Sequence, residues 1–199
     1  MKCEKLSKRL IAYLIDMIIF ALILFICSQI FKPSSNVKVL NSEMNEVNEL
    51  FMNHEISYTT YLFRYSTIIQ ALDKEKILSS LLNVIFIMFY FVFIPYFFEG
   101  QTIGRKIMKL KIVRRDSELL MVNDLVIREL IIDGLGFLLI SLCLLYIVPS
   151  IAYLILTFIL GFLQIILVLI SIFMIIYRRD NRGLHDVISN TLVVSSSEN

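Results

Sequence analysis

The chain has 199 residues; with 58% hydrophobic residues and a mean hydropathy of +0.79, it exceeds the apolar content of about 45–50% that is usual for soluble domains. A water-soluble domain of this length is excluded, because it could not bury so much apolar surface. Three scattered cysteines exclude a disulfide framework, and the net charge of +2 becomes informative only through its distribution along the chain.

The first apolar segment, about residues 10–31, predicts a membrane-spanning helix. It is about 22 residues long, which is enough to cross a bilayer. Basic residues precede it, as in a secretory signal peptide, but no A-x-A-like cleavage site follows. We therefore expect a retained helix, with one carboxylate, Asp16, inside the apolar run.

Residues 32–76 form a long connection with two halves of different composition. Apolar residues in the first half have helical spacing: Met44, Val47, Leu50 and Phe51. The second half is rich in aromatic and β-branched residues, which fits either a strand or an interfacial segment. We expect an ordered cap on the outer surface; a variable solvated loop is the alternative.

The remaining apolar residues predict three more spans. The second span is placed at about 77–98. The apolar run 130–177 is about twice as long as a bilayer-crossing helix and must fold back. Pro149 is the best breakpoint, because proline lacks an N–H and disfavours helix at the preceding residue. The third and fourth spans are therefore placed at about 127–148 and 152–177.

The segment after the second span shows local structure. Thr102 is placed to cap a short basic helix. KLKIV (109–113) and ELLMV (118–122) flank a turn and predict a small hairpin, to which the C-terminal NTLVVSS could add a strand. Asn123 or Asp124 is placed to cap the helix that leads into the third span.

Basic residues set the predicted topology. With four spans, 14 of the 19 lysines and arginines fall on one side, in the N-terminal tail, the loop 99–126 with the start of the third span, and the tail 178–199. Cationic loops remain in the cytoplasm. The sequence therefore predicts an all-α plasma-membrane protein: a four-helix transmembrane bundle with both termini cytoplasmic, residues 32–76 outside and a small cytoplasmic hairpin or sheet.

Asp16 is the most informative polar residue. A charge at this depth costs several kcal/mol even on lenient scales (roughly 2.5–3.5), so it must face protein or a water-filled cavity. Arg9, Tyr13 and Asp16 share one helix face, while the third span contributes Arg128 and Asp133. We predict a buried Asp16–Arg128 pair, with a contribution from the C-terminal tail. The pair either fixes helix packing or forms an ion or substrate relay.

Three motifs, in this order, resemble the RDD family of bacterial membrane proteins: RLIAYLID at 9–16, GQTIGRK at 100–106 followed by KLKIV, and RGLHDVI at 182–188 followed by NTLVV. The resemblance covers both ends of the chain and the central loop, but not the segment 32–76. It implies an integral membrane protein of unsettled activity. Transport of unidentified ligands is the usual suggestion for the family, and some members have been linked to sodium/proton exchange.

The family is named for one arginine and two aspartates, and the resemblance carries these over residue by residue. Arg9 matches the arginine and Asp16 matches the first aspartate. Asp186, next to His185, is our match for the second aspartate. Arg128 falls where the family tends to have an arginine ahead of its later apolar region. The resemblance thus predicts a polar network of these five residues.

Two functional hypotheses follow. The first is transport of a small ion or solute through a candidate site made of Tyr13, Asp16, Arg128 and Asp133. Four helices are few for a complete pathway, so a homo-oligomer is expected in the lipid bilayer. The second is a non-transporting membrane partner, such as an assembly, immunity or sensory accessory subunit bound to another membrane protein.

Other chemistry is not expected. The two histidines have no nearby cysteines, which argues against a metal site, and no cofactor motif is present. No nucleophile–base arrangement points to an enzyme. The basic loop is explained by membrane topology, so no nucleic-acid partner is expected.

Overall fold

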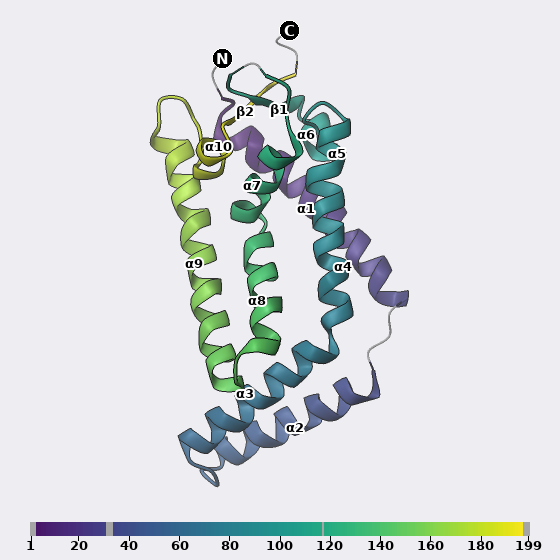
Figure 1. The fold of residues 1–199 in the computed structure, drawn as a ribbon, viewed down its shortest axis with the longest axis vertical. Helices are drawn as coiled ribbons and strands as arrows, with labels where there is room; N and C mark the ends of the chain where they lie inside the picture. The colour runs from purple at the N-terminus through teal and green to yellow at the C-terminus, as the bar shows by residue number, and fades with distance from the viewer. Residues whose placement is uncertain (1–2, 31–33, 117, 197–199) are drawn as a thin grey trace.

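The computed structural model describes residues 3–30, 34–116 and 118–196, and most of them are helical (Figure 1). The elements in chain order are α1 (Leu6–Ile30), α2 (Ser35–Met52), α3 (Tyr58–Glu75), α4 (Ile77–Ile87), a π-helical segment (Met88–Phe93), α5 (Ile94–Phe97), α6 (Ile103–Ile107), β1 (Leu110–Arg114), α7 (Val122–Ile132), α8 (Leu135–Ile147), α9 (Ser150–Tyr177), α10 (Leu184–Ile188) and β2 (Thr191–Ser195).

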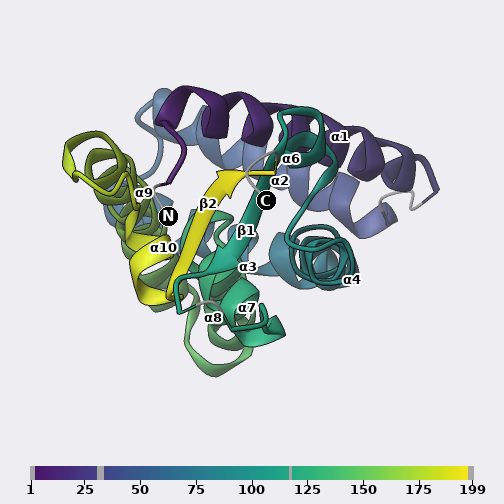
Figure 2. The same ribbon diagram turned by 90° about the horizontal axis from the view of Figure 1, so that it is seen from above.

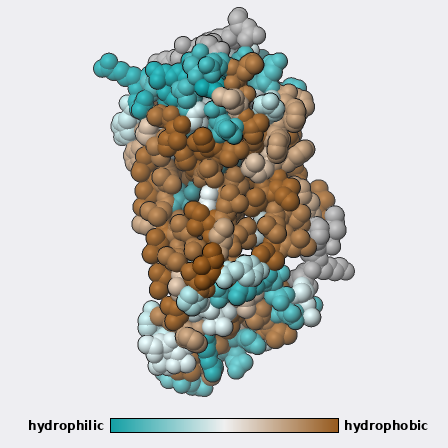
Figure 3. Space-filling view, viewed as in Figure 1, coloured by the Kyte–Doolittle hydropathy of each residue, from teal (hydrophilic) through white to brown (hydrophobic). Residues whose placement is uncertain are grey.

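The long helices form a bundle with the surface of a membrane protein. Figure 1 shows α4, α8 and α9 running side by side, with α1 crossing them obliquely. Among the described residues, three helices are long and apolar enough to cross a bilayer, namely α1, the continuous α4–α5 helix and α9. The bent pair α7–α8 makes a fourth if it is counted as one span. Figure 3 shows the result, a broad apolar band between two hydrophilic ends.

The predicted third span is broken. α7 and α8 meet at an angle of 75°, so an uninterrupted helix over 127–148 is wrong. The break lies at Gly134, whose φ of 68° is left-handed, a conformation that glycine adopts without a steric penalty. At the other end of α7, the N-cap is Met121, so the predicted cap at Asn123 or Asp124 is wrong. Asp124 lies in the first turn instead, and its carboxylate accepts the Met121 N–H at 3.0 Å.

Two other local predictions about the helices are confirmed. The fold-back lies at Pro149, the N-cap of α9. Thr102 caps α6, because its side chain accepts the Arg105 N–H at 3.3 Å. The second span also holds a feature that the sequence did not predict, the π-helical segment, which turns Tyr90 and Phe91 into the bundle.

Residues 35–75 form two helices at one end of the bundle, which we call the α2–α3 end. Both begin with serine caps, Ser34 and Ser57. The helices bury a small shared core that includes Val47, Ile68 and Leu72, and α3 also packs against α8 and α9. The helix in the first half is confirmed, whereas a strand in the second half is wrong, because this packing outweighs the β-propensity of the segment. The side of the membrane on which α2 and α3 lie remains a prediction.

The opposite end carries the only sheet within the described residues, and we call it the sheet end. β1 pairs antiparallel with β2, with Ile112 opposite Val193 (Figure 2). The predicted hairpin with ELLMV is therefore wrong, and the C-terminal segment is the partner. Ile112 is buried against Ala12 and Leu125, and Val193 of β2 belongs to the same apolar cluster. The apolar residues of β2 therefore extend the core that β1 covers. The N-terminal segment lies beside β2, because Glu4 donates its N–H to the Val193 carbonyl at 2.8 Å.

Candidate functional site

Buried charged groups gather beneath the sheet, where α1, α6, α7 and α10 meet. Asp16 and Asp186 are 1% and 0% exposed, and Arg128 and His185 are also buried. Groups of this kind are costly to remove from water unless they are paired or hydrogen-bonded. The partners of the two aspartates therefore define the site.

Asp16 is held by neutral donors. Its Oδ1 accepts from Tyr90 Oη and the Gly104 N–H, both at 2.7 Å, and its Oδ2 accepts from Thr102 Oγ1 at 2.5 Å. These bonds tie α1 to the π-helical segment and to α6. The predicted Asp16–Arg128 pair is wrong, because Arg128 donates to Asp186 instead. Tyrosine, threonine and a backbone N–H satisfy the carboxylate without a cation.

Gly104 makes this close contact possible. A Cβ at this position would lie 2.2 Å from the Ala12 carbonyl oxygen and 2.8 Å from Asp16 Cγ. Any other residue would push α6 away from α1 and break the bond to Asp16. The second glycine of the GQTIGRK motif is therefore required by close backbone approach.

Asp186 is held by arginines from two other helices. Its Oδ2 accepts from Arg9 Nη2 at 2.6 Å and from the Gly183 N–H at 2.9 Å, and its Oδ1 accepts from Arg128 Nη1. Burial by itself raises the pKa of this carboxyl, but the charges of Arg128 and Arg9 hold the pKa well below its usual range. Asp186 is therefore ionised, and it joins α10 to α1 and α7.

His185 completes this ion-pair network as a neutral residue. Burial lowers its pKa to about 4, in spite of the neighbouring Asp186, which acts in the opposite direction. Its Nε2 lies 3.0 Å from Arg9 Nη2, which can only donate, and its Nδ1 lies 2.5 Å from Ser171 Oγ. Nε2 also lies 3.2 Å from Asp186 Oδ1, and the contact of Nδ1 with Ser171 ties α10 to α9.

Between these groups lies a cavity of about 160 Å³, which we call the charged cavity. The ionisable side chains on its wall are Arg9, Tyr13, Asp16, Arg105, Arg128, Glu129, Asp133 and His185. It therefore brings together the four residues of the candidate ion or substrate site predicted from the sequence. Two of these ionisable residues, Arg105 and Glu129, were not among the predicted site residues.

Arg105 and Glu129 are the least satisfied groups of the charged cavity. Arg105 is 9% exposed and Glu129 is 1% exposed. Within the described chain, Arg105 Nη1 and Glu129 Oε1 have no hydrogen-bond partner. Burial lowers the pKa of Arg105. In the sequence, Arg105 resembled an ordinary cytoplasmic anchor, whereas the spacing of Glu129 four residues before Asp133 was the signal that could have found it.

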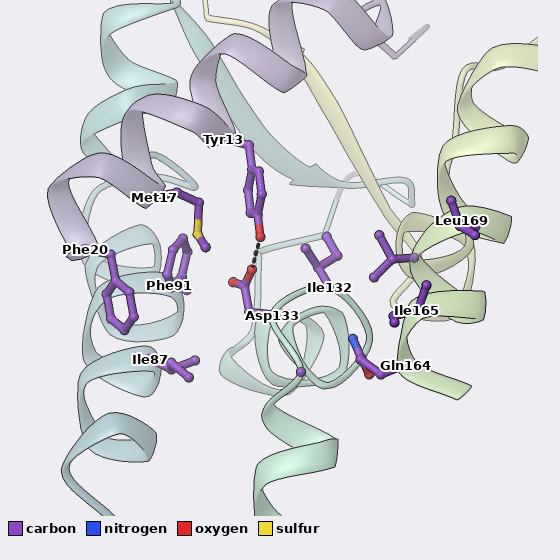
Figure 4. A pocket seen from close by; sticks show the side chains of 12 residues that line it. Tyr13, Met17, Phe20, Ile87, Phe91, Ile132, Asp133, Gln164, Ile165 and Leu169 are labelled. Carbon is purple, nitrogen blue, oxygen red and sulfur yellow. Dashed lines mark hydrogen bonds between the residues drawn. The ribbon is translucent and has the colours of Figure 1, made fainter. Parts of the chain in front are cut away.

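A second cavity of about 330 Å³, the central cavity, lies next to the charged cavity (Figure 4). Figure 4 shows Tyr13 pointing at Asp133, and Tyr13 Oη donates to Asp133 Oδ1 at 2.9 Å. Both residues line both cavities. The hydrogen bond between them is therefore part of the boundary between a charged space and a mostly apolar one.

A third cavity, of about 430 Å³, lies near the α2–α3 end and is called the distal cavity. Its polar wall includes Asp73, Ser141, Tyr153 and Thr157. Tyr153 Oη donates to Asp73 Oδ2 at 2.8 Å, which joins α3 to α9. Tyrosine–aspartate hydrogen bonds thus occur at cavities near both ends of the bundle.

The family model of the RDD family matches residues 4–190, nearly the whole chain. The chain belongs to the RDD family. Neither a curated protein nor a solved structure shows significant similarity to it. In this RDD protein, the predicted matches to the arginine and the two aspartates of the family name divide between two clusters: Arg9 binds Asp186, and Asp16 binds neutral donors.

Proposed function

We propose that this RDD protein transports a small ion or solute across the plasma membrane and that the charged cavity is its binding site. Ionisable residues within membrane-spanning helices mark ion or substrate pathways by default. In the proposed orientation the sheet end is cytoplasmic, because most of the lysines and arginines lie there. The charged cavity then opens from the cytoplasmic half of the bundle.

The observation that carries this proposal is the series of cavities along α9. Residues 153–158 line the distal cavity, residues 164–169 the central cavity and residues 168–175 the charged cavity. From Tyr153 to Ile175, α9 rises about 33 Å at ~1.5 Å per residue. This length matches a hydrocarbon core of about 30 Å.

The series is interrupted between the distal and central cavities. A Cβ on Gly161 would lie 3.8 Å from Phe137 Cε2, which is ordinary van der Waals contact. Phe137 also lines the distal cavity. We place a constriction here, formed by α8 and α9, with the Tyr13–Asp133 bond as a second constriction.

The test is ion flux in proteoliposomes that contain the native protein, Gly161→Ala or Gly161→Leu. The alanine methyl group fits against Phe137, so this variant should retain flux of protons, sodium or potassium. The leucine side chain should fill the constriction and abolish the flux. Absence of flux of all three ions in native vesicles contradicts ion transport, and native flux in Gly161→Leu contradicts the route.

The second candidate is a non-transporting partner of another membrane protein. It is favoured by the complete pairing of Asp16 and Asp186, since all four carboxylate oxygens accept hydrogen bonds. Residues paired in this way hold helices together without a ligand. If native vesicles show no flux, this candidate gains, and co-purification from the native membrane becomes the next experiment. A homo-oligomer is expected for the transporter, because four helices enclose little space.

A further inference from the structure

We infer that Glu129 and Asp133 form a proton-binding carboxyl pair, which holds one proton between Glu129 Oε1 and Asp133 Oδ2. The pair lies in the charged cavity, so the inference deepens the proposed function by naming the proton as the bound ion. The inference concerns proton binding, so it can be tested without a transport measurement.

In the part of the chain that the structure describes, each carboxyl group of the pair has one oxygen that lacks a hydrogen-bond donor. Within the described residues, Glu129 Oε1 and Asp133 Oδ2 are both buried without a hydrogen-bond partner. The residues are four apart at the end of α7, where side chains of this spacing are neighbours. Both residues line the charged cavity. Two carboxylate oxygens cannot bond to each other, but a carboxylic acid donates to a carboxylate, so one proton satisfies both atoms.

Electrostatics favour the singly protonated pair. Two adjacent carboxylates in a buried site repel each other, and each loses hydration. One proton removes a negative charge and supplies the missing hydrogen bond. The protons of such a pair belong to the pair rather than to either residue. Asp133 Oδ1 is already occupied by Tyr13 Oη, which leaves Oδ2 as the atom that shares the proton.

The neighbouring groups balance the remaining negative charge. The ionisable residues around the pair come from α1, α6, α7 and α10: Arg9, Tyr13, Asp16, Arg105, Arg128 and His185. Arg9 and Arg128 are bound to Asp186, and Asp16 has its own donors. Arg105, with an unpartnered Nη1, is the uncommitted cation of the described cavity wall. The charge of Arg105 offsets one carboxylate, so Arg105 and the pair with one proton together carry no net charge.

The same surroundings disfavour a metal ion. Hard cations in proteins take about six to eight oxygen ligands or an octahedral shell. Within the described residues, no group of three or more histidine, cysteine, aspartate or glutamate side chains could hold a metal. The Arg105 guanidinium beside the pair also repels a second cation. Release of the proton leaves two carboxylates, with Arg105 as their nearest free counter-ion.

The experiment is infrared difference spectroscopy of the protein in lipid vesicles, on exchange from H₂O to D₂O at neutral pH. The native protein should show the carbonyl band of a buried carboxylic acid. Glu129→Gln replaces the acid with an amide that can donate to Asp133, so this band should be lost while the protein remains folded. Glu43→Gln, at an exposed position on α2, should retain the native band.

Asp133→Asn provides the same comparison if Glu129→Gln does not purify. The inference is overturned if the native protein lacks the band at neutral pH or if the band survives in the cavity variants. It is also overturned if sodium chloride, in place of choline chloride at fixed pH, removes the band, because the pair would then bind sodium. The band is recorded without transport, so its presence supports the pair even in a protein that moves no ion.

Discussion

Arg9 and Asp186 lie 177 positions apart in the sequence and form a buried ion pair, with Arg9 Nη2 2.6 Å from Asp186 Oδ2. The side chains are 8% and 0% exposed. Through the second bond of Asp186, to Arg128, the pair joins both ends of the chain to the middle of the bundle. A buried charge cluster of this kind makes each member sensitive to the loss of another.

Asp186→Asn should therefore be strongly destabilising. The asparagine keeps the shape but leaves Arg9 and Arg128 buried without a carboxylate, and breaking a buried pair costs about 3–5 kcal/mol. The thermal unfolding midpoint of the detergent-solubilised protein measures this effect. The matched control is Asp180→Asn, since the Arg178–Asp180 pair is 41% exposed on both sides and should contribute little. Equal effects of the two variants would contradict the role assigned to Asp186.

Asp16→Asn should insert and purify but unfold more easily. The amide replaces one of two accepting oxygens and removes the charge that strengthens bonds from Tyr90, Thr102 and Gly104. We expect a loss of about 1–3 kcal/mol in the free energy of unfolding. Tyr90→Phe, which removes one of the three donors, should lose less. An unchanged midpoint for Asp16→Asn would show that this carboxylate does not hold α1 to α6.

Gly104→Ala should damage the same contact through sterics. The added Cβ would lie 2.2 Å from the Ala12 carbonyl oxygen, so α6 must move away from α1. Overpacking of this kind costs typically about 1–3 kcal/mol. Gly161→Ala, where the nearest atom is 3.8 Å away, is the control and should unfold like the native protein. Thermal unfolding of both variants in one detergent makes the comparison.

His185 should make the protein less stable in mild acid. Burial lowers its pKa from 6.5 to about 4, so between these values the unfolded chain binds a proton that the folded chain does not. The free energy of unfolding is therefore fully present above about pH 6.5 and decreases as the pH falls to about 4. His185→Gln should be less stable at neutral pH but should lose less between neutral pH and about pH 5. A native midpoint that does not change over this range would contradict the buried neutral histidine.

Gln70→Leu should loosen the α2–α3 end. Gln70 Nε2 donates to the Leu145 and Val148 carbonyls at 3.0 and 2.9 Å, and its Oε1 accepts from Ser150 Oγ at 2.8 Å. Loss of these bonds leaves polar groups unpaired, at about 1–3 kcal/mol. Limited proteolysis should then cut the loop between α2 and α3 faster than in the native protein.

The control for Gln70→Leu lies on the same helix. Thr67 is exposed and donates only to the Phe63 carbonyl within α3, so Thr67→Val should be cut at the native rate. Equal cleavage of the two variants would mean that Gln70 does not dock α3 on the turn between α8 and α9.

The sequence was sufficient for features that depend on local chemistry. Apolar length indicated the spans, Pro149 marked the fold-back and Thr102 marked a helix start. Three short motifs indicated the RDD family, which the family model confirms. The bend at Gly134 was missed, because a single glycine in an apolar run has many permitted conformations and only packing selects the left-handed one.

Features that depend on distant contacts were not predictable. The partners of Asp16 include a tyrosine in an apolar run and a backbone N–H, which carry no charge that the sequence could reveal. Spacing in the sequence favours a hairpin between β1 and its nearest apolar neighbour, whereas its partner β2 follows four further helices. Arg105 belongs to the basic loop 99–126 in the sequence, and its burial depends on how α6 packs against α1.

The order in which the ribosome makes the chain gives the Arg128–Asp186 pair a consequence for biogenesis. Asp186 is synthesised 58 residues after Arg128 and 177 residues after Arg9, so both arginines exist before their shared acid. A partly made chain that ends before α10 leaves these two arginines without their carboxylate. The buried ion-pair network can therefore close only when synthesis has passed α10.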